Sequence, residues 1–506
     1  MTDPAAQNET GAEGQSTGES SESGAASILE ERREKLNRLR SAGIDPFPHD
    51  FPGREEIDGV IGQHEGLEPG TETDVTHKVA GRIVGRRGHG KAAFIDLRDA
   101  SGQIQIHARA DVLGEPFALL EDLDLGDIVG VEGRAIVTRR GQLSIEAKEW
   151  QILAKSLRPP PDKFHGLEDT ETRYRRRELD LIANEDSREI FRTRARTVSE
   201  VRRWLDDNGF FEVETPVLQP LYGGALARPF TTHHNALDRK LYLRIATELY
   251  LKRCVVGGID KVYELGKDFR NEGISMKHNP EFTMLEWYEA YADYEQTALD
   301  LEHMVSGVAE RVLGRPEIER DGRTVSLEPS WHRITLRDSI LKYAGVDIYE
   351  LTERETLAEA LGIELEETVG WGKLVDMVFS KQVEPNLIEP TFILDYPEEL
   401  SPFAKGHRDT PGVVERWEAF IGGVEIANSF TELNDPDEQR RRFEQQAAEI
   451  DRGDDEAQPF DQAFIEALEQ GMPPTGGVGL GIDRLVMMLT GTSSLREVVL
   501  FPAMRD

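Results

Sequence analysis

The sequence predicts an α+β fold in which a five-stranded β-barrel of the OB type precedes a larger domain of mixed helices and strands. The first observation is a run of short segments, from about residue 75 to 155, that alternate polar and apolar residues with a period of two between glycine turns. The second is that helical and strand patterns alternate from the proline-rich segment 159–161 to residue 506. A length of 506 residues fits this division into two or three domains.

The N-terminal segment is expected to begin as a disordered acidic tail over residues 1–26, where Gly, Ser, Glu, Ala and Thr show no apolar periodicity. Ser27 followed by Glu30 forms a capping box and predicts a helix that ends near Gly43. Residues 27–74 therefore form an N-terminal helix and a connection. This basic helix could contact RNA or pack on a neighbouring element, and packing is the favoured interpretation.

The barrel is assigned to residues 75–155. A helical segment around residues 117–120 lies between the third and fourth strands, as in many OB barrels, which often bind single-stranded nucleic acid. The predicted strands span residues 79–86, 92–98, 103–107, 128–137 and 143–153.

Four residues of the first three strands are candidates for nucleic-acid binding. Phe94 could stack on a base, Gln105 could hydrogen-bond its edge, and Arg86 and Arg87 could pair with phosphates. The alternative is that Phe94 belongs to the barrel core, and the sequence favours neither.

A linker is expected over residues 156–180, stiffened by three consecutive prolines, and a second domain over residues 181–506. Within that domain, residues from about 310 to 410 lack polar motifs of the kind that line pockets. We expect a mostly helical insertion there.

Composition excludes some classes of protein. The net charge of −35 argues at first against a nucleic-acid partner, yet basic clusters such as 173–177 and 192–203 reverse the sign locally. The single cysteine, Cys254, excludes a disulfide framework and indicates a reducing cytoplasm. We see neither a membrane-spanning apolar stretch nor a secretory signal.

The most informative segment reads strand, polar loop, strand over residues 269–288. The two-residue period places Phe282, Met284, Glu286 and Tyr288 on one face of the second strand. A carboxylate between these side chains would be costly in an ordinary core. With Arg270, Glu272 and His278 beside it, the segment indicates a pocket for a ligand with an aromatic ring, phosphates and a cation, rather than a solvated hairpin.

A second constellation surrounds the hairpin signal Gly422-Gly423. It brings Glu418 and Glu425 onto adjoining strands, and paired carboxylates that face phosphates commonly hold Mg²⁺. Asn428 and Glu432 share a face of the second strand. Taken alone, the segment would fit a solvated acidic hairpin better.

The third constellation is the glycine-rich run 476–481, which leads into an apolar helix with Arg484 near its start. The run matches neither the P-loop nor the dinucleotide fingerprint. Arg484 could bind a phosphate or stack on a base. A purely structural role is the alternative.

Two further features are given structural roles. His233 and His234 are neighbours on a strand, so they point to opposite faces and are unsuited to binding one metal. Cys254 lies in an apolar helix and is interpreted as a buried thiol.

Together these segments resemble a known family. Residues 209–216, the segment 269–282 and the run 476–484 resemble motifs 1, 2 and 3 of class II aminoacyl-tRNA synthetases, in order. The N-terminal barrel is similar to that of the lysine, aspartate and asparagine subgroup. The strings at residues 223–234, 242–251 and 283–294 resemble bacterial-type lysyl-tRNA synthetases, and the similarity extends from about residue 28 to 506.

The resemblance implies an antiparallel-sheet catalytic domain, a cytoplasmic homodimer formed through the motif 1 region, and L-lysine, ATP with Mg²⁺, and tRNA(Lys) as partners. It implies catalytic roles for Arg270 and Arg484, and an anticodon-binding role for Arg86, Arg87, Phe94 and Gln105. The implied ATP-binding residues are Arg270, Glu272, His278, Phe282, Glu418 and Arg484; the lysine-binding residues are Gly224, Glu248, Glu286, Tyr288, Asn428 and Glu432; the metal ligands are Glu418 and Glu425.

The choice of lysine also has a physical argument. A buried ammonium requires counter-charges, and Glu286, Glu432 and the Tyr288 phenol supply them, whereas an aspartate or asparagine pocket needs a cation or amide donors. The expected activity is formation of lysyl-adenylate followed by transfer to tRNA. The alternatives are a paralogue that lysylates a protein, an aspartyl- or asparaginyl-type enzyme, and a non-catalytic RNA-binding protein.

Overall fold

The computed structural model describes residues 16–161, 167–362, 370–451 and 457–505. The chain divides into two compact units, Met1–Glu168 with Glu178–Ala183 and Asp169–Arg177 with Asn184–Asp506. The predicted linker 156–180 is thus shared between the units, and it contains α4 (Thr170–Arg175) and the start of α5 (Arg177–Ala183).

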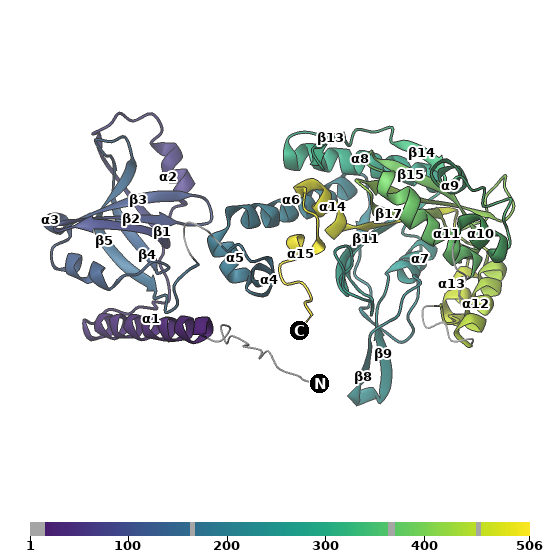
Figure 1. Cartoon of the computed structure of the whole chain (residues 1–506), viewed down its shortest axis with the longest axis horizontal. Coiled ribbons are helices and arrows are strands. Elements are labelled where there is room, and N and C mark those ends of the chain that lie inside the picture. Colours follow the sequence, from purple (N-terminus) through teal and green to yellow (C-terminus); the bar gives the residue numbers. More distant parts are fainter. Residues whose placement is uncertain (1–15, 162–166, 363–369, 452–456, 506) are drawn as a thin grey trace, which may run out of the picture. The chain divides into compact units, whose positions relative to one another are not determined.

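The first unit is built on the expected five-stranded barrel, closed in the order β1-β2-β3-β5-β4 (Figure 1). Its core consists of inward-facing aliphatic side chains such as Ile83, Leu97 and Ile145, as the period of two requires. Two short helical segments, α3 (Ala110–Leu113) and η1 (Glu115–Asp122), occupy the predicted place before β4. The strands are β1 (Glu72–His89), β2 (Ala92–Arg98), β3 (Gln103–Arg109), β4 (Ile128–Val137) and β5 (Leu143–Ala154). Helix α2 (Ile57–Gln63), in the connection before β1, packs on the barrel.

The N-terminal helix is longer than the sequence predicts. Helix α1 spans Ser16–Ser41, so Ser27 lies inside the helix and is not its N-cap. Once a helix is nucleated, extending it costs little, and Gly24 alone does not stop it. The predicted disorder of residues 1–26 is therefore wrong for residues 16–26, and residues 1–15 lie outside the described part of the chain.

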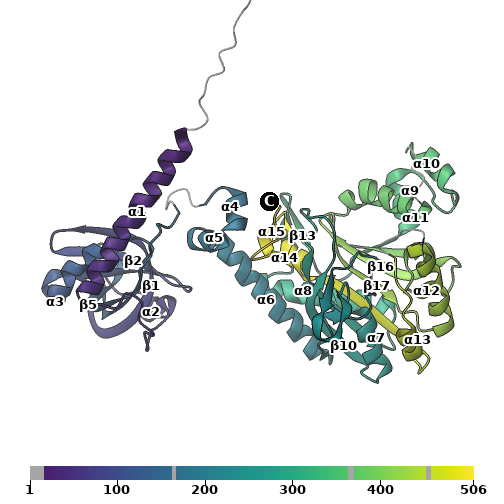
Figure 2. The ribbon, with the colours of Figure 1, turned by 90° about the horizontal axis from the view of Figure 1, so that it is seen from below.

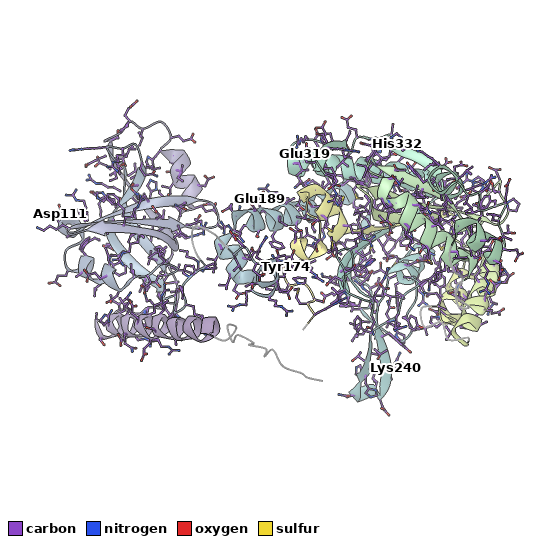
Figure 3. All side chains as sticks on the ribbon, viewed as in Figure 1. Asp111, Tyr174, Glu189, Lys240, Glu319 and His332 are labelled. Atoms are coloured by element: carbon purple, nitrogen blue, oxygen red, sulfur yellow. The ribbon has the colours of Figure 1, made fainter. Side chains whose placement is uncertain are left out.

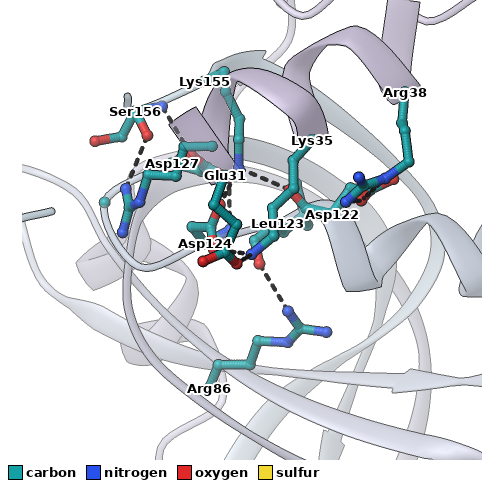
Figure 4. Close-up of polar contacts among 12 residues, drawn as sticks. Glu31, Lys35, Arg38, Arg86, Asp122, Leu123, Asp124, Asp127, Lys155 and Ser156 are labelled. Carbon is teal, nitrogen blue, oxygen red and sulfur yellow. Dashed lines mark hydrogen bonds and ion pairs between the residues drawn. The ribbon is translucent and has the colours of Figure 1, made fainter. Parts of the chain in front are cut away.

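Ion pairs fix α1 to the barrel (Figure 4). Lys35 Nζ lies 2.7 Å from an Asp124 carboxylate oxygen, and Arg38 pairs with Asp122 at 2.6 Å. Lys155, which is fully buried, binds both Asp124 at 2.6 Å and Asp127 at 2.8 Å. Packing of this basic helix on the barrel, the favoured interpretation, is confirmed.

The second unit is organised around an eight-stranded sheet in the order β14-β15-β16-β17-β18-β11-β10-β6 (Figure 1). Neighbouring strands are antiparallel except for the pairs β10–β6 and β14–β15. The strands are β6 (Phe211–Glu212), β10 (Lys261–Phe269), β11 (Glu281–Ala290), β14 (His332–Thr335), β15 (Thr391–Pro397), β16 (Val413–Ile421), β17 (Val424–Thr431) and β18 (Thr475–Gly481).

Helices cover this sheet. The main core packs Trp287 and Trp417 of the sheet against Leu301 of α8 and Leu485 of α14. A separate apolar cluster joins α7 to α12 and α13, which lie side by side in Figure 2. The helices are α6 (Glu185–Asp207), α7 (Glu248–Val256), α8 (Tyr294–Leu313), α12 (Pro436–Asp451), α13 (Gln462–Leu468), α14 (Ile482–Thr490) and α15 (Leu495–Val498).

The expected helical insertion over about residues 310–410 is wrong at both ends. Helices α9 (Leu336–Ala344), α10 (Arg354–Leu361) and α11 (Trp371–Val378) do gather there, together with short helical turns at 379–386 (Figure 2). The flanking strands β14 and β15, however, belong to the main sheet, and β12 (Glu317–Arg320) pairs with β13 (Arg323–Ser326). The apolar start of β15 is buried on both faces, so it lacks the alternation that marks a strand.

A small sheet, β7-β9-β8, stands apart from the main one. Its strands are β7 (Leu218–Gln219), β8 (Thr231–His234) and β9 (Arg239–Leu243). The β8–β9 hairpin projects from its unit in Figure 1, and Figure 3 marks Lys240 near its tip. In the part of the chain that the structure describes, no helix is long and apolar enough to cross a membrane.

Candidate active site

A cavity of about 330 Å³ opens beside strands β11, β17 and β18 and helix α7. It gathers nearly all of the residues singled out from the second domain's sequence. The lining includes Gly224, Glu248, Arg270, Glu272, His278, Phe282, Glu286, Tyr288, Glu425, Asn428, Glu432 and Arg484.

Strand β11 supplies one wall by simple alternation. Phe282, Met284, Glu286 and Tyr288 all line the cavity, as predicted. The intervening Leu285 and Trp287 are completely buried in the main core behind the sheet. The alternation of side chains along the strand therefore places one face of β11 in the cavity and the other face in the hydrophobic core.

One end of the cavity is acidic and fully enclosed. The Glu286 carboxylate accepts hydrogen bonds from the Thr247 backbone N–H at 3.0 Å and from the Tyr288 hydroxyl at 3.0 Å. Burial, with the nearby carboxylates of Asp268 and Glu248, raises the pKa of Glu286 to about 8. At neutral pH this group is held protonated until a cation reaches it.

Glu248 and Glu432 face the same end. Burial raises the pKa of each carboxyl group, and that of Glu432 is raised well above its usual range. Both are bound by Lys252, a completely buried residue that the sequence analysis missed. The available signal was the i,i+4 spacing of Glu248 and Lys252 on one helix.

Glycines allow these acidic side chains to approach the sheet. A Cβ atom added at Gly477 on β18 would overlap the Glu432 carboxylate and lie 2.5 Å from a ring carbon of Tyr288. At Gly224, where φ is +90°, a Cβ atom would lie 2.9 Å from that of Glu248. Any other residue would clash at the first position and would also be strained at the second.

The other end of the cavity carries arginines. The Arg270 guanidinium lies over the Phe282 ring, 5.1 Å from its centroid. Arg484 pairs with Glu425 at 2.9 Å. His278 lies in the loop before β11, where its Nδ1 is 2.9 Å from the Ser275 hydroxyl. The Phe282 ring is therefore stacked on Arg270.

Strand pairing holds motifs 2 and 3 together. Asp483, at the start of α14, accepts a hydrogen bond from the Thr283 backbone N–H at 2.8 Å and pairs with Arg194 of α6 at 2.6 Å. The β11 strand that follows the motif 2 loop is thus joined by polar contacts to the motif 3 segment and to helix α6. This arrangement fixes Arg484 relative to the β11 wall.

Glu418 is the predicted site residue that does not line the cavity. The Gly422-Gly423 turn forms as expected, and it places Glu425 opposite Phe420 and Glu418 opposite Asn428. Glu418 instead binds Arg416 at 2.5 Å and the Tyr396 hydroxyl at 2.8 Å. Arg416, which the sequence analysis also missed, lines the cavity itself.

In the barrel, Phe94 alternates with the buried Ala93 and Ile95, so it is excluded from the core. Its ring stacks on His107, with centroids 4.6 Å apart and an interplanar angle of 4°. Gln105 accepts a hydrogen bond from Ser144 on the adjoining strand. The interpretation of Phe94 as barrel core is wrong.

The two arginines on β1 are exposed. Arg86 donates to the Leu123 carbonyl oxygen at 2.7 Å (Figure 4), and Arg87 lies 3.5 Å from an Asp96 carboxylate oxygen. Both guanidinium groups keep exposed N–H donors on the barrel surface.

A cavity with an acidic end and an arginine end on a largely antiparallel sheet, in a chain that also contains an OB barrel, is the combination expected of a class II tRNA synthetase. In agreement, residues 169–505 match the family model described as tRNA synthetases class II (D, K and N). Residues 77–153 match the model of the OB-fold nucleic acid binding domain.

Similarity to individual proteins is more specific. The chain is 50% identical to the lysine–tRNA ligase of Carboxydothermus hydrogenoformans, over 94% of this chain and 98% of that protein. Identity is 51% to the Moorella thermoacetica lysine–tRNA ligase and 50% to that of Bacillus cereus, again over 94% of this chain and over 98% and 96% of those proteins. The chain belongs to the lysine–tRNA ligase family of class II synthetases.

Proposed function

We propose that this protein activates L-lysine with ATP and transfers the lysyl group to the 3′ end of tRNA(Lys). The observation that carries this proposal is the enclosed end of the cavity, where Glu248, Glu286 and Glu432 converge with the Tyr288 phenol. Three carboxylates in a buried space suit a ligand with more than one positive charge.

Each part of lysine then has a counterpart. Glu286, Tyr288 and Glu432 bind the ε-ammonium, and Glu248 with the backbone at Gly224 binds the α-ammonium. Asn428 lies near the substrate carboxylate. Selection of lysine follows from charge, because the acidic side chain of aspartate would be repelled by these carboxylates and the neutral amide of asparagine would leave their charges uncompensated.

ATP occupies the arginine end in this proposal. Arg270 binds the α-phosphate and the lysine carboxylate, while His278 and Arg484 bind the outer phosphates. Phe282 stacks on the adenine and Glu272 lies near its amino group. The lysine carboxylate attacks the α-phosphorus in line, pyrophosphate leaves, and a terminal ribose hydroxyl of tRNA then takes the lysyl group from the adenylate.

No side chain is required as a general base for the first step, because the attacking carboxylate is already ionised. Arg270 and Arg484 hold the reacting groups together and neutralise charge that develops on the phosphate oxygens. Positioning and electrostatic stabilisation of this kind account for most of the rate in phosphoryl chemistry.

The residues present fit Mg²⁺ as the cofactor of ATP. Burial, with repulsion from Glu425, raises the pKa of Glu418 to about 7. A divalent cation held by Glu418 and Glu425 would relieve this repulsion and neutralise phosphate charge. Among the described residues, no group of three or more His, Cys, Asp or Glu side chains forms a metal site, which fits an ion held largely by ATP.

The barrel is the proposed anticodon-binding domain. Phe94 stacks on a base, Gln105 contacts a base edge, and Arg86 and Arg87 bind the RNA backbone. The outward position of Phe94 supports this role.

A homodimer formed through the motif 1 region is also proposed. Strand β6 is an end strand of the eight-stranded sheet, with Phe211 61% exposed. Leu218 nearby is 50% exposed. An open strand edge with exposed apolar side chains favours pairing with another chain.

We also propose that the protein acts in the reducing cytoplasm, because its sequence contains one cysteine.

The test is ATP–pyrophosphate exchange across a panel of amino acids, followed by charging of unfractionated tRNA. We expect exchange with lysine and not with aspartate or asparagine, and charging of tRNA(Lys). Exchange driven by aspartate, or no exchange with any amino acid, would refute the assignment of lysine as the substrate. Exchange without tRNA charging would favour the protein-lysylating alternative, against which the N-terminal barrel argues.

Lysine binding is expected to release protons at pH 7. The pKa of Glu286 is about 8 in the free protein, so this carboxyl group is mostly protonated there and must ionise to pair with an ammonium. Calorimetric titration in buffers of different ionisation enthalpy should show release of about one proton or more per lysine bound.

The release should diminish above pH 9, because Glu286 is then already ionised, and it should fall in Glu286→Gln. Release that does not change with pH between 6 and 9 would contradict the assignment of Glu286 to the ammonium.

A further inference from the structure

Lys252 is a buried cation inside the lysine pocket itself. Its side chain is completely buried, and its Nζ lies 2.6 Å from Glu248 Oε1 and forms a second ion pair with the Glu432 carboxylate. The rings of Phe403 and Phe430 lie on its other sides, with centroids 5.4 and 5.5 Å from Nζ. Carboxylates and aromatic faces thus enclose this ammonium.

The ion pair with Lys252 orients the Glu432 carboxylate, which has few other polar contacts. Both Glu432 carboxylate oxygens are buried, and apart from the ion pair of Lys252 with Oε2 neither has a hydrogen-bond partner among the described residues. The Glu432 backbone N–H is held by the Thr475 carbonyl oxygen at 2.8 Å, which places the residue but not the orientation of its carboxylate. Lys252 therefore determines which way the Glu432 carboxylate points.

Charge balance gives Lys252 a second effect. The pocket holds three carboxylates, those of Glu248, Glu286 and Glu432, and Lys252 supplies one positive charge. A lysine ligand adds two ammonium groups, while its carboxylate is assigned to Arg270, so the pocket around the two ammonium groups then contains three charges of each sign. Without Lys252 one carboxylate would stay unpaired or protonated, because an uncompensated buried charge is unfavourable.

We propose that Lys252 is a positioning residue that orients Glu248 and Glu432 and keeps both of them ionised, so that the pocket is matched to a ligand with two positive charges. This role rests on the proposed lysine-activating function. It requires that the substrate ammonium groups join the ion pairs of Lys252 rather than displace it.

The groups that face these carboxylates make the effect of Lys252 predictable in sign. Glu286 and Tyr288 of β11 and Glu248 of α7 surround Glu432 with negative or polar oxygen atoms, and Asp268 of β10 acts on Glu286. The attraction of Lys252 lowers the pKa of Glu248 and of Glu432. Removal of the ammonium therefore raises both pKa values. Lysine binding, which requires ionised carboxylates, then shifts to higher pH.

The test compares Lys252→Met with Lys155→Met in lysine-dependent ATP–pyrophosphate exchange by the full-length protein. Methionine keeps the length of the side chain and removes its charge. Lys155 is the matched control, since it is also a completely buried lysine between two carboxylates, but it lies in the barrel unit. Comparison of the two variants distinguishes the general effect of losing a buried ion pair from the specific effect of losing the Lys252 ammonium.

In Lys252→Met we expect the KM for lysine at pH 7 to rise at least about tenfold, with the KM for ATP changed by less than about twofold. The profile of kcat/KM for lysine should move up by about one pH unit, so that raising the pH from 7 to 9 recovers much of the loss. Lys155→Met should leave both the KM for lysine and the pH profile unchanged.

Lys252→Arg keeps the charge and is the second variant. It should retain the wild-type pH profile even where crowding raises the KM, and it keeps the test decisive if Lys252→Met does not fold. An unchanged KM for lysine in Lys252→Met, equal effects on both substrates, or a higher KM with an unshifted profile would overturn the proposal. Failure of the wild-type protein to exchange with lysine would instead refute the proposed function.

Discussion

Gly477→Ala is expected to raise the KM for lysine by about a hundredfold or more, with little effect on the KM for ATP. The added methyl group would overlap the Glu432 carboxylate and press on the Tyr288 ring. The backbone of β18 cannot move away from Glu432, because this strand is hydrogen-bonded to β11 on one side and to β17 on the other. The clash is relieved only if Glu432 leaves the position in which it meets an ammonium, and loss of a buried charged partner costs about 2–5 kcal/mol.

Gly479→Ala, two residues along the same strand and on the same face, is the matched control. A Cβ atom there has its nearest neighbour, the Met284 sulfur, at 3.8 Å, which is an ordinary contact. Steady-state exchange kinetics with each substrate varied, and thermal unfolding of both variants, give the comparison. Similar KM values for lysine in the two variants would mean that Glu432 does not bind the substrate.

The second large effect is expected from Arg270→Ala, which should lower kcat for adenylate formation by roughly a thousandfold. Arg270 is assigned to the α-phosphate and the lysine carboxylate, the two groups that react, so its loss removes charge stabilisation and orientation together. Arg270→Lys restores the charge without the planar pair of donors and should recover only part of the rate.

Single-turnover adenylate formation measures this step without product release. Arg239→Ala, on the exposed β8–β9 hairpin, is the control and should leave the rate unchanged. If the rate of adenylate formation fell by less than about tenfold in Arg270→Ala, the catalytic assignment would be contradicted. Arg270 would then have only a structural role, through its contact with the Phe282 ring.

The extent to which sequence predicts structure varies along this chain. Four barrel strands agree closely with their predicted bounds because burial alternates along them and produces a clear period of two, whereas β1 (Glu72–His89) extends beyond the predicted 79–86 at both ends. Strand β15 is buried on both faces and was assigned to a helical insertion. The start of α1 was misplaced because a capping box is only a local preference, and helix propagation overrides it.

The candidate site likewise contains features that the sequence predicts and features that it does not. The Phe282, Met284, Glu286 and Tyr288 wall follows from alternation along one strand. Glu418 lies opposite Asn428, on the same face of the sheet, but it pairs with Arg416 and Tyr396 and does not line the cavity. Partners that come from other strands in this way are not predicted by the alternation along one strand.

The class of this protein could be inferred from its sequence alone, because three ordered motifs and a barrel pattern are carried by short stretches with fixed local geometry. The sequence also pointed to many residues that line the cavity, although not to Arg416. The folded structure was needed to show that Lys252 lies between Glu248 and Glu432 and that Gly477 leaves room for the Glu432 carboxylate. These contacts join segments far apart in the chain, and a buried charge is stable only where folding brings its partners to it.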